Sequence, residues 1–276
     1  MSELQYNMLF SDIDGTLMNS RRRISANNRR SINEYRNAGG IFSLATGRNY
    51  MQTHSLIHEL GINIPVILCD GAMLYDPIRE EEQVLASLTH LQGEQILEEG
   101  HLISKEIYVY FACYNPIDRS HHFYGVDDLP IIRQFCAQWS YSFTILPSFR
   151  NIPSTAELIT AVIYIADLNA TEPFHDWYQK QPDLYGTAYS DQFIELSAVH
   201  ATKGHGIRTV CEQLNHPLDR VAAIGDHIND LPMVDLVGCF ASLANGEMEV
   251  MDRANILVRS NDEDGFSDFI RHLLNL

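Results

Sequence analysis

The chain has 276 residues, 45% of them hydrophobic and 20% charged, which is typical of a globular protein with room for two domains. It carries 36 acidic and 19 basic residues, and this formal net charge of −17 argues against a surface that binds nucleic acid or anionic lipid. No stretch approaches the roughly 20 apolar residues of a membrane span, and Met1-Ser2-Glu3 lacks the basic and apolar regions of a signal peptide.

Five cysteines are scattered along the chain, and none lies in a Cys-x-x-Cys pair. This pattern is typical of reduced thiols in the cytoplasm rather than of a disulfide framework or a zinc site. His54 and His58 lie four residues apart on an expected helix, but no third ligand is suggested nearby, so we interpret them as an exposed helix face. We interpret the arginines at 21–23 as a solvated rim, with contact to an anionic substrate as the alternative.

Short apolar strands alternate with helices in the first part of the chain. We expect a strand over Met8–Asp12, a helix over Ala26–Asn37, a strand over Ile41–Thr46, a helix over His54–Leu60 and a strand over Val66–Cys69. Ser25 is the expected N-cap of the first helix. This order predicts a parallel sheet with helices on both of its faces.

The middle of the chain differs, because its expected strands are rich in aromatic residues. We expect strands over Ile107–Phe111, Phe143–Leu146 and Ala161–Ile165, and helices over Leu129–Trp139 and Glu172–Gln181. We interpret residues 83–197 as a separate α+β domain inserted into a catalytic domain formed by residues 1–82 and 198–276.

The strand and helix alternation returns near the C-terminus. The expected helices cover Gly204–Leu214, Leu231–Val237, Gly246–Arg253 and Gly265–Leu274, and the expected strands cover Val221–Ile224, Cys239–Ser242 and Ile256–Val258. The predicted fold class is therefore α/β, with a Rossmann-like parallel-sheet core and an inserted α+β domain.

Two carboxylates lie at the end of the first expected strand, in Asp12-Ile13-Asp14-Gly15-Thr16. In a strand, residues i and i+2 point to the same side, so both carboxylates are expected to face one small volume. Two like charges brought together in this way require a cation, a shared proton, or both. Asp-Gly is also ordinary turn chemistry, so this pattern needs support from the rest of the chain.

Three further polar motifs lie where expected strands end or helices begin. Thr46-Gly47 follows the second strand and offers a hydroxyl and backbone N–H groups to an anion. Lys203 precedes a helix and offers a point charge for a phosphate oxygen. Each motif alone is explained as well by a helix cap or a surface charge.

The last motif, Gly225-Asp226-His227-Ile228-Asn229-Asp230, follows the strand that ends at Ile224. Asp226 and Asp230 are explained, taken alone, by an N-cap and a first-turn acid. Ligands of open α/β sheets bind beyond the carboxyl ends of the strands, and all four motifs are expected at that edge. Their joint placement predicts a binding site.

The four motifs together resemble those of the haloacid dehalogenase-like phosphohydrolases. The resemblance rests, in chain order, on Asp12-x-Asp14-Gly15-Thr16, Thr46-Gly47-Arg48, Lys203-Gly204 and Gly225-Asp226-x-x-Asn229-Asp230. More narrowly, the chain is similar to the Cof-type branch, in which a large α/β cap of the C2B type is inserted between the second and third motifs. The resemblance covers nearly the whole chain, including Asp262-Glu263-Asp264-Gly265.

This resemblance implies a mechanism for the two leading aspartates. Asp12 would be the nucleophile that attacks phosphorus and becomes an aspartyl phosphate. Asp14 would protonate the leaving oxygen and then deprotonate the water that hydrolyses the intermediate. It also implies Mg²⁺, held by the Asp12 carboxylate, the Asp14 backbone carbonyl and Asp226.

The resemblance assigns the remaining motif residues to the phosphoryl group. Thr46 and Gly47 would bind the group that is transferred, and Lys203 would neutralise its oxygens. Asn229 would contact the phosphate as well. Asp230 would orient Lys203 or a metal-bound water rather than bind the metal itself.

One position departs from the pattern of the branch, which has Asn-Gly-Ala after its third strand. Here the run is Cys69-Asp70-Gly71-Ala72. A carboxylate at position 70 would repel a phosphate dianion unless it is protonated, paired or turned away.

The leading hypothesis is a Mg²⁺-dependent phosphatase of small phosphorylated metabolites, with sugar phosphates first among them. A phosphomutase of the same fold is one alternative, and a non-catalytic phosphometabolite-binding protein is another. The expected partner is a small phosphorylated metabolite, not a nucleic acid or a membrane. The expected location is the cytoplasm, and neither the oligomeric state nor the physiological substrate follows from the sequence.

Overall fold

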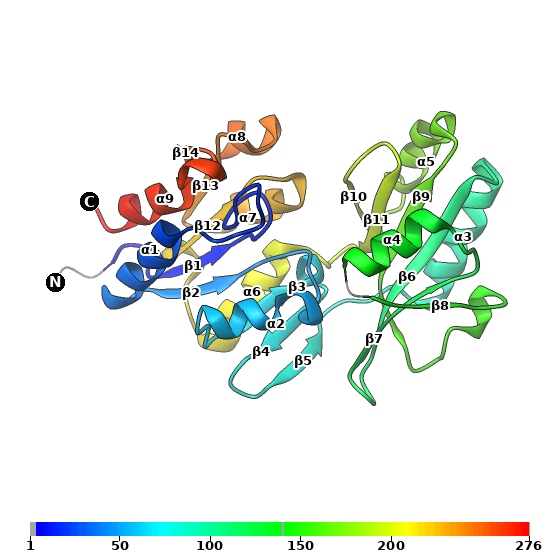
Figure 1. Ribbon diagram of the computed structural model, residues 1–276, viewed down its shortest axis with the longest axis horizontal. Coiled ribbons are helices and arrows are strands. Elements are labelled where there is room, and N and C mark those ends of the chain that lie inside the picture. The colour runs from blue at the N-terminus through cyan, green and yellow to red at the C-terminus, as the bar shows by residue number, and fades with distance from the viewer. Residues whose placement is uncertain (1–3, 140, 276) are drawn as a thin grey trace. The chain divides into compact units, whose positions relative to one another are not determined.

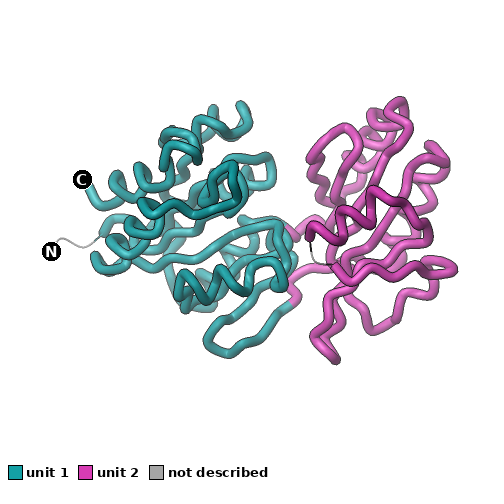
Figure 2. The backbone as a smooth tube through the Cα atoms, in the orientation of Figure 1, with its two compact units in different colours: residues 1–83, 202–276 teal, residues 84–201 magenta. Residues whose placement is uncertain are grey.

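The chain folds as two units in the computed structural model, which describes residues 4–139 and 141–275. Unit 1 consists of residues 1–83 and 202–276, and unit 2 of residues 84–201 (Figure 2). Residues 1–3, on which the expectation about a signal peptide rests, lie outside the described residues. Within the described ranges, no helix is long and apolar enough to cross a membrane.

Unit 1 is built on a parallel sheet of five strands in the order β14-β13-β12-β1-β2 (Figure 1). Its strands are β1 (Met8–Ser11), β2 (Ile41–Leu44), β12 (Val221–Gly225), β13 (Cys239–Leu243) and β14 (Ile256–Val258). Strands β1, β12 and β13 are buried along their whole length, as expected for the middle of a sheet whose two faces are covered. The α/β fold class predicted from the sequence is confirmed.

The helices of unit 1 begin at polar caps that the sequence carries. They are α1 (Ala26–Asn37), α2 (Tyr50–Glu59), α6 (Lys203–Leu214), α7 (Leu231–Val234), α8 (Met248–Arg253) and α9 (Gly265–Leu273). Ser25 caps α1, as predicted, by accepting a hydrogen bond from the Asn28 backbone. Asn49 caps α2 in a capping box with Gln52, so this helix begins four residues earlier than expected.

A small sheet of three strands follows the parallel one: β3 (Val66–Leu68), β4 (Met73–Asp76) and β5 (Glu81–Val84). A tight turn, Cys69–Gly71, joins β3 to β4, and the two strands pair antiparallel. Only β3 was predicted. The turn carries non-glycine residues in left-handed conformations, which local sequence does not signal.

Unit 2 contains a sheet of six strands in the order β10-β11-β9-β6-β7-β8. The strands are β6 (Ile107–Asn115), β7 (Ser120–Gly125), β8 (Ser142–Ile145), β9 (Glu157–Ile165), β10 (Leu184–Ala188) and β11 (Phe193–Ala198), with helices α3 (His90–Ile103), α4 (Pro130–Gln138) and α5 (Thr171–Tyr178). The neighbouring strands pair antiparallel except β7 with β8.

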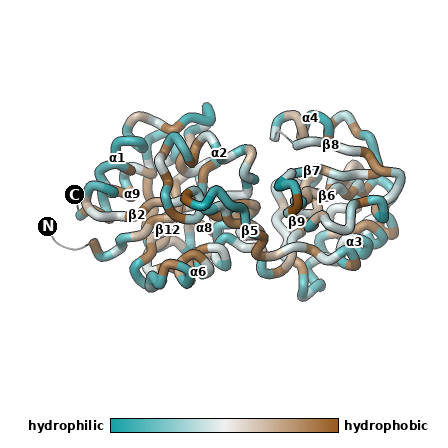
Figure 3. The backbone as a smooth tube through the Cα atoms, turned by 90° about the horizontal axis from the view of Figure 1, so that it is seen from below, coloured by the Kyte–Doolittle hydropathy of each residue, from teal (hydrophilic) through white to brown (hydrophobic). Residues whose placement is uncertain are grey.

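Two apolar clusters form the core of unit 2. One gathers residues of α3 and α5, such as Ile96 and Phe174, and the other gathers residues of α4, such as Ile132 and Cys136. Strand β6 of unit 2 and strand β12 of unit 1 consist mainly of hydrophobic residues (Figure 3).

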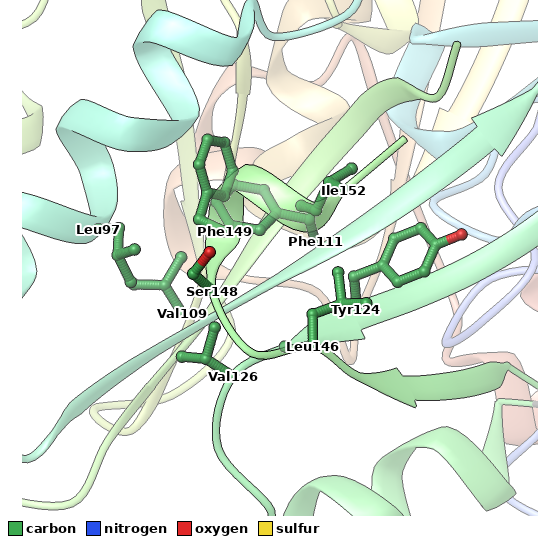
Figure 4. A pocket seen from close by; sticks show the side chains of 10 residues that line it. Leu97, Val109, Phe111, Tyr124, Val126, Leu146, Ser148, Phe149 and Ile152 are labelled. Atoms are coloured by element: carbon green, nitrogen blue, oxygen red, sulfur yellow. The ribbon is translucent and has the colours of Figure 1, made fainter. Parts of the chain in front are cut away.

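A small, partly open apolar hollow lies in unit 2 (Figure 4). Its lining comes mainly from β6, from the residues at the end of β7 and from the segment 146–152, with Leu97 of α3. The lining residues carry no ionisable group other than the Tyr124 phenol. A phosphate would find no cation among these lining residues.

Candidate active site

The carboxyl ends of β1, β2 and β12 lie side by side at one edge of the parallel sheet. Ser11, the last residue of β1, is in register with Leu44 of β2 and with Ile224 of β12. The residues that follow these strands therefore start from neighbouring points. The backbone N–H of Asp12 donates to the Ile224 carbonyl at 3.0 Å, which fixes the first motif beside the last one.

Lys203 lies at the centre of this edge and is fully buried. Its Nζ donates to Asp12 Oδ1 and to Asp230 Oδ1, each at 2.7 Å. Thr202 caps α6 by accepting a hydrogen bond from the His205 backbone, which places Lys203 in the first turn. A buried ammonium of this kind requires paired carboxylates, and here it has two.

Asp230 uses both of its oxygens within the protein. Oδ1 accepts from Lys203, and Oδ2 accepts from the backbone N–H groups of Asp226 at 2.9 Å and His227 at 3.0 Å. A carboxylate bound in this way orients Lys203 and the loop after β12. These contacts support the interpretation of Asp230 as a residue that positions its neighbours.

Asp226 lies against the loop that follows Asp14. Thr16 Oγ1 donates to Asp226 Oδ1, and a Cβ at position 15 would lie 2.2 Å from Asp226 Oδ2. Only glycine at position 15 lets the carboxylate come this close, and its φ of +80° also favours glycine. The tight turn at Gly15 therefore places the first motif in contact with the last.

Asp12, Asp226 and Asp230 each offer an oxygen, and these atoms all lie within 4.8 Å of one another. Asp230 accepts three hydrogen bonds from the protein, whereas the Asp12 carboxylate accepts from Lys203 at Oδ1. An oxygen-only donor set with excess negative charge is what a hard divalent cation requires. The residues present therefore fit a divalent metal.

The pKa values of this cluster reflect burial and repulsion between the acids. Burial raises the pKa of Asp12 well above its ordinary value, against the opposing attraction of Lys203. Burial, with the charge of Asp230, raises the pKa of Asp226 to about 7. Burial lowers the pKa of Lys203, but the surrounding carboxylates, Asp12 foremost, more than offset this and leave it raised.

The raised pKa of Asp226 predicts a pH-dependent cost to stability. Between its ordinary pKa of 3.8 and about 7, the folded metal-free protein keeps a proton that the unfolded chain has lost, so this carboxyl lowers stability progressively as the pH rises. Asp226→Asn should therefore raise the melting temperature in EDTA by roughly 5 °C at about pH 8. The gain should shrink towards about pH 4.

The matched control for this experiment is Asp219→Asn. Asp219 is exposed and precedes β12, so it lies at the opposite edge of the sheet from the acids. Melting curves of both variants and the wild type at the two pH values decide the result. A gain that does not depend on pH, or that Asp219→Asn shares, would contradict this account of Asp226.

Asp14 is placed differently from the sequence expectation. Strand β1 ends at Ser11, so the alternation of side chains along a strand does not carry Asp14 to the side of Asp12. The Asp14 carboxylate, 43% exposed, instead accepts two hydrogen bonds from Arg48, from Nε at 2.7 Å and from Nη2 at 2.6 Å. Its position is set by this bidentate pair.

The second motif forms the other wall of the site. The Thr46 backbone N–H donates to Ile67, and Thr46 Oγ1 accepts from the Arg48 backbone at 3.2 Å. A Cβ at position 47 would lie 3.2 Å from Asp70 Oδ2, so Gly47 faces the Asp70 carboxylate. Thr46 and Gly47 therefore lie beside the turn that carries Asp70.

Asn229 and Asp70 are hydrogen-bonded to each other. Asn229 Nδ2 donates to Asp70 Oδ1 at 2.9 Å, and that oxygen lies 4.0 Å from Lys203 Nζ. Both residues are buried. The residues assigned to phosphate binding thus surround a carboxylate of the protein itself.

The structure brings together six sequence-predicted positions around Lys203, while the Asp14 carboxylate is bound by Arg48. The six are Asp12, Gly47, Asp70, Asp226, Asn229 and Asp230. Arg48 and Thr16 lie within the sequence motifs, but no role was predicted for either of them. Their partners lie 34 and 210 residues away along the chain, and local spacing carries no signal for such pairs.

Comparison with known sequences gives consistent matches along the chain. The sequence profile of the haloacid dehalogenase-like hydrolases matches residues 9–270. The chain is 27% identical to phosphatase YwpJ of Bacillus subtilis, over 95% of this chain and 98% of that protein. It is 26% identical to pyridoxal phosphate phosphatase YbhA of Escherichia coli, over 95% of this chain and 97% of that protein.

Comparison with solved structures supports the same fold. A haloacid dehalogenase-like hydrolase from B. subtilis matches with a TM-score of 0.82 at 22% identity, over 97% of this chain and 99% of that one. At this identity the match bears on the fold alone. Both units are covered by it.

Proposed function

The chain belongs to the haloacid dehalogenase-like hydrolases and is a phosphoric monoester hydrolase, and we propose that it hydrolyses small phosphorylated metabolites through an aspartyl phosphate on Asp12. The observation that carries this proposal is the buried arrangement around Lys203. A lysine held between Asp12 and Asp230, next to Asp226, has the charges that phosphoryl transfer requires.

In the first step, an oxygen of Asp12 bonds to phosphorus and the bond from phosphorus to the leaving oxygen breaks. Asp12 Oδ1 is held by Lys203, which leaves Oδ2 as the attacking atom. Asp14 donates a proton to the leaving oxygen. Its side chain is partly exposed and is oriented by Arg48, so a substrate oxygen can reach it.

In the second step, a water oxygen bonds to phosphorus and the bond to Asp12 breaks. Asp14 now takes a proton from this water, so that the enzyme returns to its starting state. Lys203 remains beside the Asp12 oxygen throughout and stabilises the charge on the transferred group, while Asp230 holds Lys203 in place. Thr46, Gly47 and Asn229 bind the oxygens of the same group.

The metal would be Mg²⁺, with Asp12, the Asp14 backbone carbonyl and Asp226 as its protein ligands. When bound, Mg²⁺ offsets the negative charge of the acids and of the phosphoryl oxygens. The support for it is the cluster of carboxylate oxygens of Asp12, Asp226 and Asp230 within 4.8 Å of one another, which carries more negative charge than the ammonium of Lys203 offsets.

Unit 2 would be the cap that selects the substrate, and the protein would act in the cytoplasm. A cap restricts access of water during transfer and contacts the leaving group. Sugar phosphates are the first substrates to test. The names of two relatives specify pyridoxal phosphate and 5-amino-6-(5-phospho-D-ribitylamino)uracil, which extends the test to other phosphorylated metabolites.

The test is a screen for release of inorganic phosphate from sugar phosphates, nucleotides and cofactor phosphates with Mg²⁺ present. We expect turnover of at least one class, its loss in EDTA, and its recovery when Mg²⁺ is added in excess. Interconversion of a sugar monophosphate without release would indicate a phosphomutase. No activity on any member, with or without Mg²⁺, would contradict the proposal and favour a phosphometabolite-binding protein.

A further inference from the structure

Asp70 lies where the proposed phosphate-binding groups converge, although an anion there opposes the binding of phosphate. Its carboxylate contacts Asn229 Nδ2 at 2.9 Å, lies 4.0 Å from Lys203 Nζ and faces the backbone of Gly47. These three positions come from three separate motifs of the chain. Asp70 is 8% exposed, so its carboxylate is held inside the site.

The backbone fixes this position of Asp70. Cys69, Asp70 and Gly71 have φ angles of 48°, 53° and 94°, a run of left-handed residues that needs support from its surroundings. The Asp70 backbone N–H donates to Thr46 at 3.0 Å, and the Cys69 N–H donates to Arg48 at 3.0 Å. A Cβ at position 71 would lie 2.0 Å from the Thr202 carbonyl, so the turn packs directly against the start of α6.

The hydrogen-bond donors of the site are already partly used. Lys203 has three N–H donors, and Asp12 and Asp230 take two of them. The third donor remains for a phosphate oxygen, and Asp70 Oδ1 lies 4.0 Å from the same nitrogen. Asn229 Nδ2 already donates to the same oxygen. Phosphate and Asp70 would therefore compete for the Asn229 Nδ2 donor and for the positive charge of Lys203.

The net charge of the site also opposes the binding of phosphate. Lys203 is the one ammonium among the carboxylates of Asp12, Asp70 and Asp230, which leaves the site with excess negative charge. A further unit of negative charge within about 4 Å of a phosphate dianion repels it and weakens its binding. The same repulsion acts on inorganic phosphate and on the substrate phosphoryl group.

We propose that Asp70 is an internal competitor for phosphate, which occupies the phosphate-binding groups between turnovers and weakens the retention of the inorganic product. The inference rests on the proposed function of the same site. It predicts that the wild type tolerates high phosphate concentrations, because its own carboxylate takes the place of the product.

The test measures the dissociation constant of inorganic phosphate by calorimetry at saturating Mg²⁺. Asp70→Asn keeps the shape and an oxygen that accepts from Asn229 but removes the charge, and asparagine tolerates the left-handed backbone. We expect it to bind phosphate at least about tenfold more tightly than the wild type. Asp70→Gly, which also tolerates this backbone, should tighten binding as well, whereas Asp219→Asn should not.

Equal or weaker phosphate binding by Asp70→Asn and Asp70→Gly, in proteins that still release phosphate from a substrate, would overturn the inference and leave the proposed function intact. A loss of Mg²⁺ affinity in Asp70→Asn would also overturn it, because Asp70 would then belong to the metal site. Absence of both phosphate binding and turnover in the wild type would instead refute the proposed function.

Discussion

Replacing Asp12 by Asn is expected to lower turnover by at least about 10⁴-fold, because the amide cannot act as the nucleophile that forms the phosphorylated intermediate. The shape of the side chain is kept, and its oxygen can still accept from Lys203, which now donates at 2.7 Å. Burial and the neighbouring acids raise the pKa of Asp12, so removing its charge relieves repulsion in the metal-free protein. We therefore expect the variant to fold and to melt no lower than the wild type in EDTA.

Phosphate release measured over long incubations decides this prediction, with the melting temperature as the test for folding. Asp219→Asn, which changes the same functional group at an exposed position, serves as the control and should keep full activity. Turnover within about tenfold of the wild type in a folded Asp12→Asn protein would mean that another group attacks phosphorus.

Replacing Lys203 by Met is expected to damage both stability and activity. The ammonium is completely buried and is the hydrogen-bond donor between Asp12 and Asp230, so its removal leaves two carboxylates without their cation. Breaking a buried pair of this kind costs about 3–5 kcal/mol, which corresponds to a fall in melting temperature of roughly 10 °C. Turnover should fall by at least about 10³-fold, because the charge that stabilises the transferred group is lost.

The control for this variant is Arg208→Met, which removes an exposed cation from the same helix. A second variant, Lys203→Met with Asp230→Asn, separates the two effects. It should recover part of the lost stability, because one unpaired charge is gone, but none of the activity. A Lys203→Met protein with unchanged stability, or a double variant with restored turnover, would contradict the account.

The core of unit 1 was predictable because its strands are buried on both faces. Val221-Ala222-Ala223-Ile224 is a continuous apolar run closed by glycine, and such runs are typical of parallel strands. In unit 2, β7 begins Ser120-His121-His122, and its half-buried polar residues hide the strand pattern. The helix over His90–Ile103 was missed as well, since glycines at 93 and 100 interrupt its apolar face.

The sequence predicted which residues belong to the site better than it predicted how their side chains are arranged. The ends of β1, β2 and β12 had to meet at one edge of the sheet, so Asp12, Thr46 and Asp226 were expected together. The pairing of Asp14 with Arg48 depends on where β1 stops and how the next turn closes, which spacing does not determine. The direction of the Asp70 carboxylate likewise follows from a left-handed turn that non-glycine residues adopt.

The charge of the site links its stability to its function. Burial and the charge of Asp230 raise the pKa of Asp226 to about 7, and carboxylates surround Lys203. The metal-free site therefore lowers the stability of the folded protein. Asp70 adds one more carboxylate to the same volume. Binding of a divalent cation should therefore raise the melting temperature of the wild type, and more so near pH 8 than near pH 5.

The central claim is that phosphorus becomes bonded to Asp12 during turnover. The most direct test stops the wild-type enzyme during reaction with a phosphate monoester and Mg²⁺, reduces the acyl phosphate with borohydride, and locates the modified position by mass spectrometry. We expect the modification at Asp12 and its absence from Asp12→Asn. Release of phosphate with no modification at position 12, or with modification at another residue, would contradict the account.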